Sequence, residues 1–217
     1  MKRFIGALAA LATAGTVLAS APAASGAAPD SAVAPKERSL VTWLRSDGNA
    51  YDRNGADFDI VTRAALAVLA AKPDSPVAVL ADGDQRLTAF LPNDRAFRLL
   101  AKDLTGRTIH SERKVLNTLV SAAGVDTIEQ VLLYHVVLGK KLTSKKVLKA
   151  DGARFTTAQG ARIRVKVRHA HGRPVISIVD QDRNARNARV VLSKVDRNKG
   201  NKQIGHGIDR VLRPIDL

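Results

Sequence analysis

The stretch at residues 46–59 is rich in Asp, Asn and Gly, whose side-chain or backbone oxygens could hold Ca²⁺. An EF-hand loop of that kind needs oxygen ligands at positions 1, 3 and 5, followed by Gly at position 6 and Glu at position 12. The frame from Asp47 reaches Tyr51 at the third ligand, and the frame from Asp52 reaches Ala56. Because both frames fail there, turns and a helix cap are the favoured interpretation, and we predict no metal site.

Two histidines could also hold a metal ion. His169 and His171 are two residues apart in a predicted strand, so their side chains would share one face. No third ligand is evident nearby, and Arg168 and Arg173 are poor electrostatic neighbours for a cation. This pair therefore does not change the prediction of no metal.

Catalytic groups are sparse. Asp209 could orient His206, yet neither a Ser nor a Cys nucleophile accompanies them, and the chain contains no Cys at all. The sequence has no nucleophile elbow, phosphate loop, dinucleotide fingerprint or zinc-binding helix motif. We predict that the protein is not an enzyme and that it uses no cofactor.

The charge of the chain is unevenly distributed. The formal net charge is +15, but 15 basic and 14 acidic residues precede Lys140, whereas 20 basic and 6 acidic residues follow from Lys140 to Leu217. Such asymmetry indicates a surface for an anionic partner. The alternative is that the excess of Lys and Arg only keeps the protein soluble.

Two groups of basic residues carry much of this excess. Five lysines fall within ten residues, and four further basic residues alternate with apolar ones in a predicted strand, which places a charge about every 6.6 Å. That spacing suits a linear polyanion, such as an anionic polysaccharide or wall polymer. Aromatic residues make up only 4% of the chain, which argues against a stacking platform for single-stranded nucleic acid. In an exported protein, wall polymers, acidic polysaccharide or lipid head groups are expected partners rather than genomic DNA, so we predict no nucleic-acid partner. The candidate polyanion-binding residues are Lys140, Lys141, Lys145, Lys146, Lys149, Arg162, Arg164, Lys166 and Arg168.

The first residues have the order of a secretory leader. Lys2 and Arg3 precede an apolar run at residues 4–19, and small residues with Pro22 follow. As a helix this run would span about 24 Å, short of the roughly 30 Å hydrocarbon core, which disfavours a membrane anchor. We predict a signal peptide at residues 1–23, a flexible linker at residues 24–39, and a secreted product in the extracellular space or at the cell envelope, without a transmembrane span.

The spacing of apolar residues predicts the elements that position these side chains, and after Tyr134 it changes from a helical pattern to strand-like alternation. A first helix is predicted from Asp57 or Asp59 to Lys72, and a second from the N-cap Asn93 to Leu104. Two further helices are predicted, one from the N-cap Ser111 to Val120 and one from the N-cap Thr127 to Leu133, with Gly124 as the stop between them. Strands are predicted at 87–91, 161–168, 175–179, 188–195 and 208–212. Helices followed by strands indicate an α+β fold.

Three segments, in this order, resemble the fasciclin-like (FAS1) domain family. They are LTAFLPNDRAFRLL at Leu87–Leu100, VLLYHVVLG at Val131–Gly139, and IGHGIDRVLRP at Ile204–Pro214. The resemblance covers about residues 40–217, which we take as a single domain of the secreted bacterial type. The residues that match the family's motifs are Thr88, Phe90, Pro92, Asn93, Phe97, Tyr134, His135, His206, Asp209, Leu212 and Pro214.

The resemblance implies a β-wedge of two sheets with helices packed along one side. It also implies an extracellular module that adheres to cell-surface, matrix or cell-wall polymers or proteins and is not an enzyme. Tyr134, His135 and His206 have two interpretations, as buried hydrogen-bonding groups or as ligand contacts. The alternative function is an exported enzyme or stress factor whose chemistry the motifs do not reveal.

Overall fold

The computed structural model of the protein describes residues 37–48 and 51–215. The predicted signal peptide and most of the predicted linker lie outside the described residues. Residues 37–39 of that linker are described, and two of them, Glu37 and Arg38, contact the loop at residues 197–202. The backbone N–H of Arg38 donates to Asn201 Oδ1 (2.9 Å), and the backbone N–H of Lys202 donates to the Glu37 carboxylate (2.9 Å).

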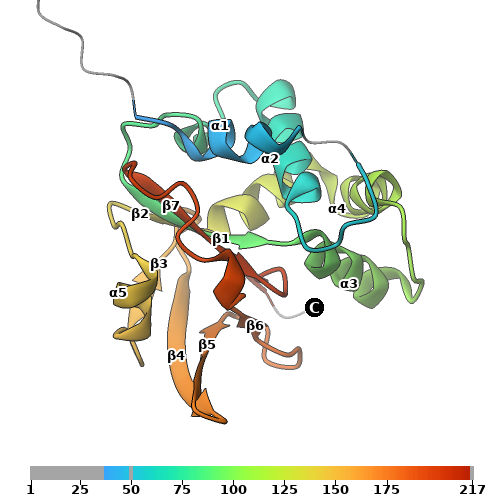
Figure 1. The fold of residues 1–217 in the computed structure, drawn as a ribbon. Helices are drawn as coiled ribbons and strands as arrows, with labels where there is room; N and C mark the ends of the chain where they lie inside the picture. The colour runs from blue at the N-terminus through green and yellow to red at the C-terminus, as the bar shows by residue number, and fades with distance from the viewer. Residues whose placement is uncertain (1–36, 49–50, 216–217) are drawn as a thin grey trace, which may run out of the picture. The chain divides into compact units, whose positions relative to one another are not determined.

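The first sheet has three strands in the order β2-β1-β7 (Figure 1). The central strand β1 (Leu87–Pro92) pairs in parallel with β7 (Gln203–Ile208) and antiparallel with β2 (Val136–Leu138). All six residues of β1 are buried, which fits a strand covered on both faces. The strand predicted at residues 87–91 is confirmed.

The second sheet is antiparallel, with the strand order β3-β4-β5-β6. Its strands are β3 (Arg154–Thr156), β4 (Arg162–Ala170), β5 (Arg173–Val179) and β6 (Ala188–Arg189). A two-residue turn joins β4 to β5, and both of its residues have positive φ, 50° at His171 and 72° at Gly172. The idea that His169 and His171 share a strand face is therefore wrong, because His171 lies in the turn.

Helices precede the second sheet in the chain. Helix α4 is interrupted at Gly124, whose φ of 74° and ψ of 164° are not helical, as predicted for a stop at that residue. The α-helices are α1 (Leu40–Leu44), α2 (Asp59–Ala71), α3 (Asp94–Thr105), α4 (Glu112–Tyr134) and α5 (Ser144–Leu148), and the 3₁₀ helices are η1 (Arg45–Asp47), η2 (Pro76–Leu80) and η3 (Leu192–Lys194).

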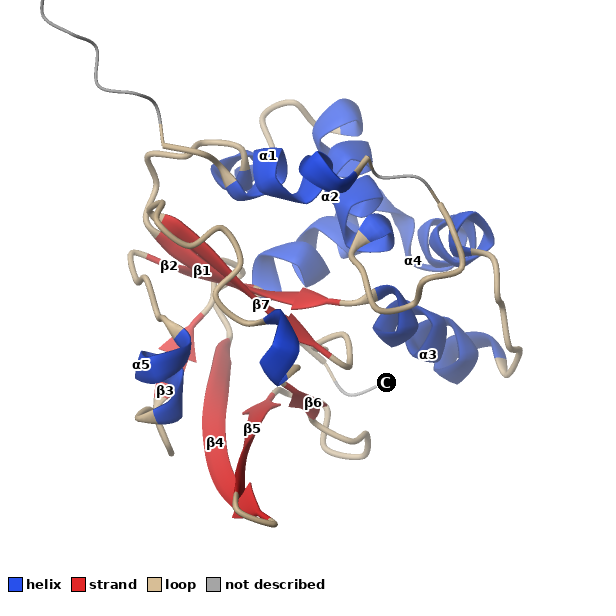
Figure 2. Ribbon diagram, viewed as in Figure 1, coloured by secondary structure: helices blue, strands red, loops and turns tan. Residues whose placement is uncertain are grey.

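Alternation along β1 divides the interior into two cores. Leu87, Ala89 and Leu91 pack against α1–α4, whereas Phe90 points the other way, into a core shared with Ile178 and other inner-face residues of the second sheet. The layers are thus helices, first sheet and second sheet, and helices α1–α4 gather on one side of the first sheet (Figure 2). The predicted α+β wedge of two sheets is confirmed.

Two predicted strands are wrong in extent. Strand β7 ends at Ile208, opposite Pro92 at the end of β1, so the chain beyond it has no partner strand and residues 208–212 do not form one. The strand predicted at 188–195 is only two residues long in β6. After it the chain turns toward β7, and the backbone N–H of Val191 donates to Gly207 O (2.8 Å).

Candidate functional site

The basic residues of β4 lie on the face of the second sheet that points away from the core. Arg162, Arg164 and Arg168 are exposed and Lys166 is half-buried, while the intervening Val165 is fully buried. Alternation is the cause, since successive side chains of a strand point to opposite faces. The period-two pattern of the sequence thus places all four basic side chains on one face.

Neighbouring strands add basic residues that the sequence pattern did not reveal. Arg154 of β3 stands directly opposite Arg164, Ser177 of β5 stands opposite Lys166, and Arg189 of β6 stands opposite Ser177. Cross-strand partners share a face, so these arginines join the β4 row. We call this set the outer basic face, which consists of Arg154, Arg162, Arg164, Lys166, Arg168 and Arg189.

The outer basic face is not neutralised by the protein. None of the ion pairs among the described residues includes any of its six members. The Asp151 carboxylate lies at the edge of β4, where it accepts a hydrogen bond from the Val167 N–H (2.7 Å). Arg154 and Arg164 are directly opposite one another in β3 and β4, and like charges in that position destabilise a strand pair.

The predicted lysines lie elsewhere. Lys140 and Lys141 are in the loop between β2 and α5, Lys145 and Lys146 are in α5, and Lys149 is its C-cap. Val147 of the same helix packs in the core with Ile163 and Val165, on the inner face of the second sheet. The lysines of α5 and the outer basic face are therefore on opposite sides of this sheet, and the predicted set forms two surfaces.

The buried Tyr134 and His135 follow one another at the end of α4. The Tyr134 hydroxyl donates to Arg162 O (3.2 Å), and burial raises its pKa to about 12. His135 Nε2 accepts from the Leu212 N–H (2.8 Å), so the proton is assigned to Nδ1, which donates to Val131 O (2.6 Å). Burial lowers the pKa of His135 to about 4, which keeps the ring neutral.

His206 is held in a similar way in β7. Its Nε2 donates to Leu142 O (2.6 Å) and its Nδ1 accepts from the Asp196 N–H (3.3 Å), while burial lowers its pKa. Asp209, beyond the end of the strand, instead accepts from the backbone N–H of Arg189 (2.6 Å) and from the Arg186 side chain (2.8 Å). The idea that Asp209 orients His206 is wrong, because neither ring nitrogen of His206 bonds to it.

The other motif residues are structural supports. The Thr88 hydroxyl donates to Lys140 O (2.7 Å) and accepts from the Leu142 N–H (2.8 Å). The Asn93 side chain caps α3 by accepting from the Ala96 N–H (2.9 Å), as predicted. Three of the remaining motif residues, Phe90, Phe97 and Leu212, pack in the two cores. Pro92 ends β1, and Pro214 follows the last strand.

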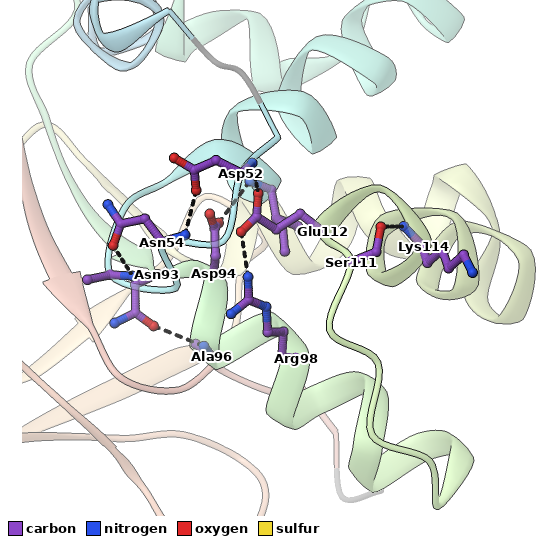
Figure 3. Close-up of polar contacts among 11 residues, drawn as sticks. Asp52, Asn54, Asn93, Asp94, Ala96, Arg98, Ser111, Glu112 and Lys114 are labelled. Carbon is purple, nitrogen blue, oxygen red and sulfur yellow. Dashed lines mark hydrogen bonds and ion pairs between the residues drawn. The ribbon is translucent and has the colours of Figure 1, made fainter.

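A second cluster, which the sequence did not reveal, gathers three carboxyl groups from different elements. Figure 3 shows two of them, those of Asp94 and Glu112. Asp57 comes from the loop before α2, Asp94 from the start of α3 and Glu112 from the start of α4. Asp94 is fully buried, and its Oδ1 accepts from the Ile60 N–H (2.9 Å). Asp94 therefore caps α2, and the prediction that Asp57 or Asp59 caps it is wrong.

The carboxyl oxygens of this cluster are close together. One oxygen from each of Asp57, Asp94 and Glu112 lies within 4.8 Å of the others. Glu112 accepts from Arg98 Nη2 (2.6 Å) and from the backbone N–H of Asp52 (2.8 Å). Burial, together with the neighbouring Asp57, raises the pKa of Asp94 to about 9, and burial also raises the pKa of Glu112.

A cavity of about 610 Å³ lies beside this cluster. The residues that line it come from the loop before α2, from α3, from the loop between α3 and α4, and from the first residue of α4. They are Tyr51, Asp52, Arg53, Arg98, His110, Ser111 and Glu112.

Comparison with known proteins identifies the family. A family model described as "Fasciclin domain" matches residues 65–214. The chain belongs to the fasciclin domain family. None of the curated proteins compared with it matches the chain.

A solved structure of a FAS1 domain pair from the insect cell adhesion molecule fasciclin I has the same fold. It matches with a TM-score of 0.52 and 18% sequence identity, over 82% of this chain and 51% of that one. This fasciclin chain thus spans about half the length of the domain pair.

Fasciclin domains are in general adhesion or binding modules and not enzymes, and they are typically extracellular. Within the part of the chain that the structure describes, no helix combines the length and the apolar character needed to cross a bilayer.

Proposed function

We propose that this fasciclin protein is a secreted adhesion module that binds an anionic polymer, such as an acidic polysaccharide or wall polymer, through the outer basic face. The observation that carries the proposal is the gathering of six basic side chains from β3, β4 and β6 on one sheet face. Maintaining that arrangement without ion pairs costs stability, and an external polyanion would offset the cost.

The geometry suits an extended, repeating partner. Charges along β4 recur about every 6.6 Å, and a basic residue near an anionic surface contributes about 1 kcal/mol. Four to six engaged residues would contribute about 4–6 kcal/mol, which corresponds to a Kd between about 1 mM and 40 µM for one chain, with strong dependence on salt. The outer basic face contains no aromatic residue on which bases could stack, so a polysaccharide or wall polymer fits better than single-stranded nucleic acid.

The internal hydrogen bonds of the motif histidines favour binding over catalysis. His135 and His206 each use both ring nitrogens within the fold, so neither offers a nitrogen to a substrate. A lowered pKa with both nitrogens engaged is typical of a structural histidine and not of a general base.

Two variants of equal charge test the proposal. In the first, Arg162, Arg164, Lys166 and Arg168 are replaced by Ser; in the second, Lys140, Lys141, Lys145 and Lys146 are replaced by Ser. We expect the first variant to elute from a polyanion column at much lower salt than the wild type, and the second to elute close to it. Equal losses in the two variants would show only general charge attraction and would refute the assignment to this face.

A pull-down from the cell envelope of the producing organism would identify the partner. Capture at low salt that the four Ser replacements in β4 abolish supports a wall or surface polymer as the partner. Capture that the same variant retains contradicts the proposal.

A further inference from the structure

We propose that Asp57, Asp94 and Glu112 bind one Ca²⁺ ion. Nothing in the proposed polymer binding requires this site, which lies among the helices and not on the second sheet. Its geometry is that of an ion site, since one oxygen from each residue lies within 4.8 Å of the others, and oxygens around a Ca²⁺ ion at 2.3–2.6 Å are up to about 5 Å apart.

A fully buried oxygen without a donor is the second observation that points to a ligand. Asp94 Oδ1 is occupied by the Ile60 N–H, but Asp94 Oδ2 has no hydrogen-bond partner among the described residues, and neither does the buried Oδ1 of Asp57. Leaving a buried carboxylate oxygen unsatisfied is unfavourable, so such oxygens normally face a donor or a metal. Figure 3 shows the Asp94 carboxyl pointing from the start of α3 toward the Asp52 loop and Glu112.

The charge of the cluster fits a divalent cation. When all three carboxyls are ionised, Arg98 offsets one charge through its ion pair with Glu112, and two negative charges remain. A second set of carboxyl oxygens, from Asp52, Asp57 and Asp59, also lies within 4.8 Å and shares Asp57 with the first. Ca²⁺ takes six to eight oxygens in flexible geometry, whereas Mg²⁺ needs a near-ideal octahedron, so irregular ligands from a loop and two helices favour Ca²⁺.

An ion can reach the cluster. Glu112 and Asp52 line the cavity of about 610 Å³, and Asp57 is half-buried, so the ion would enter from this side. The alternative occupant is a proton shared by Asp57 and Asp94, which the raised pKa of Asp94 allows. Ca²⁺ would displace that proton, because a metal ligand must be deprotonated.

Calorimetric titration of the purified protein with CaCl₂ at pH 7.5 tests the proposal. We expect one site with a Kd of about 0.1–1 mM and a rise of about 3–8 °C in the unfolding temperature at 10 mM Ca²⁺.

Variants locate the ion. Asp94→Asn keeps an oxygen for the Ile60 N–H but removes the charge, and Asp57→Asn changes a half-buried residue outside the helices, so both are expected to fold. Each should weaken Ca²⁺ binding at least about tenfold, while the exposed Asp74→Asn should leave it unchanged. Absence of heat and of a shift in unfolding temperature in the wild type would overturn the proposal in favour of a shared proton. Equal binding by wild type and Asp94→Asn would overturn it in favour of another site.

Discussion

His135 and Leu212 are joined by a hydrogen bond across 77 residues, in which the Leu212 N–H donates to His135 Nε2 (2.8 Å) in the core. The other ring nitrogen donates to Val131 O, one turn earlier in α4. The neutral imidazole thus connects the end of α4 to the chain that follows β7. It can do so only while Nε2 is unprotonated.

Acid should weaken this link. The pKa of His135 is about 4 in the folded protein and 6.5 when unfolded, so the unfolded state binds more protons between these values. The free energy of unfolding should therefore fall by about 3 kcal/mol from this residue as the pH drops from 7 to 4. Urea unfolding of His135→Gln, which cannot titrate, should show a shallower pH dependence. The exposed His169→Gln should keep the wild-type slope, and an unchanged slope in His135→Gln would contradict the assignment.

Gln203 should be among the most sensitive positions in the first sheet. This fully buried side chain accepts from the Leu40 N–H (2.6 Å) and donates to Val79 O (2.8 Å) and Asp82 O (2.7 Å). Gln203→Leu keeps the size but leaves three backbone groups without partners, so we expect a loss of about 3–5 kcal/mol in urea unfolding. Gln130→Leu, at an exposed position of α4, serves as the control and should change stability by less than about 0.5 kcal/mol.

Arg213 should stabilise the end of the chain through a buried ion pair. Its guanidinium donates to Asp182 (2.9 Å), whose side chain is 1% exposed, and also to Asp103. Burial alone would raise the pKa of Asp182, but hydrogen bonds from Ala185 and Arg213 lower it on balance.

Arg213→Met should destabilise the protein by about 3–5 kcal/mol, because it leaves the Asp182 carboxylate buried without its partner. The double variant with Asp182→Asn should recover part of this loss in thermal or urea unfolding. If the loss of stability in the double variant equals the sum of the losses in the two single variants, the ion pair contributes little.

The outer basic face should reduce stability. Arg154 and Arg164 are directly opposite in β3 and β4, so Arg154→Thr should raise the free energy of unfolding by about 0.2–1 kcal/mol at low salt. The gain should shrink as salt screens the repulsion. Arg107→Thr, an exposed replacement in the loop after α3, should show no such salt-dependent gain. A gain of equal size at both sites would contradict the proposed repulsion.

Local patterns determined much of the fold. The alternation at residues 161–168 sets which face of β4 is basic, and it does so independently of the rest of the chain because successive strand side chains point to opposite faces. Asn93, Ser111 and Gly124 likewise mark helix ends by interactions within a few residues. These short-range rules, with the three fasciclin segments, were enough for the α+β wedge.

Long-range contacts decided the extent of strands and the location of buried groups. Strand β7 begins at Gln203 and ends at Ile208 because β1, more than a hundred residues earlier, supplies its parallel partner only over that length. No pattern in residues 203–212 alone contains that information, which is why the strand was predicted too late in the chain.

The carboxyl cluster shows the same limit. An EF-hand search of residues 46–59 fails because it requires all ligands in one loop, whereas Asp57, Asp94 and Glu112 come from three elements. Likewise, Arg154 and Arg189 joined the basic face only through strand pairing. The sequence by itself determined which faces are polar or apolar, because that depends on neighbouring residues. Only the tertiary structure decided which polar groups meet, because that depends on how distant segments pack.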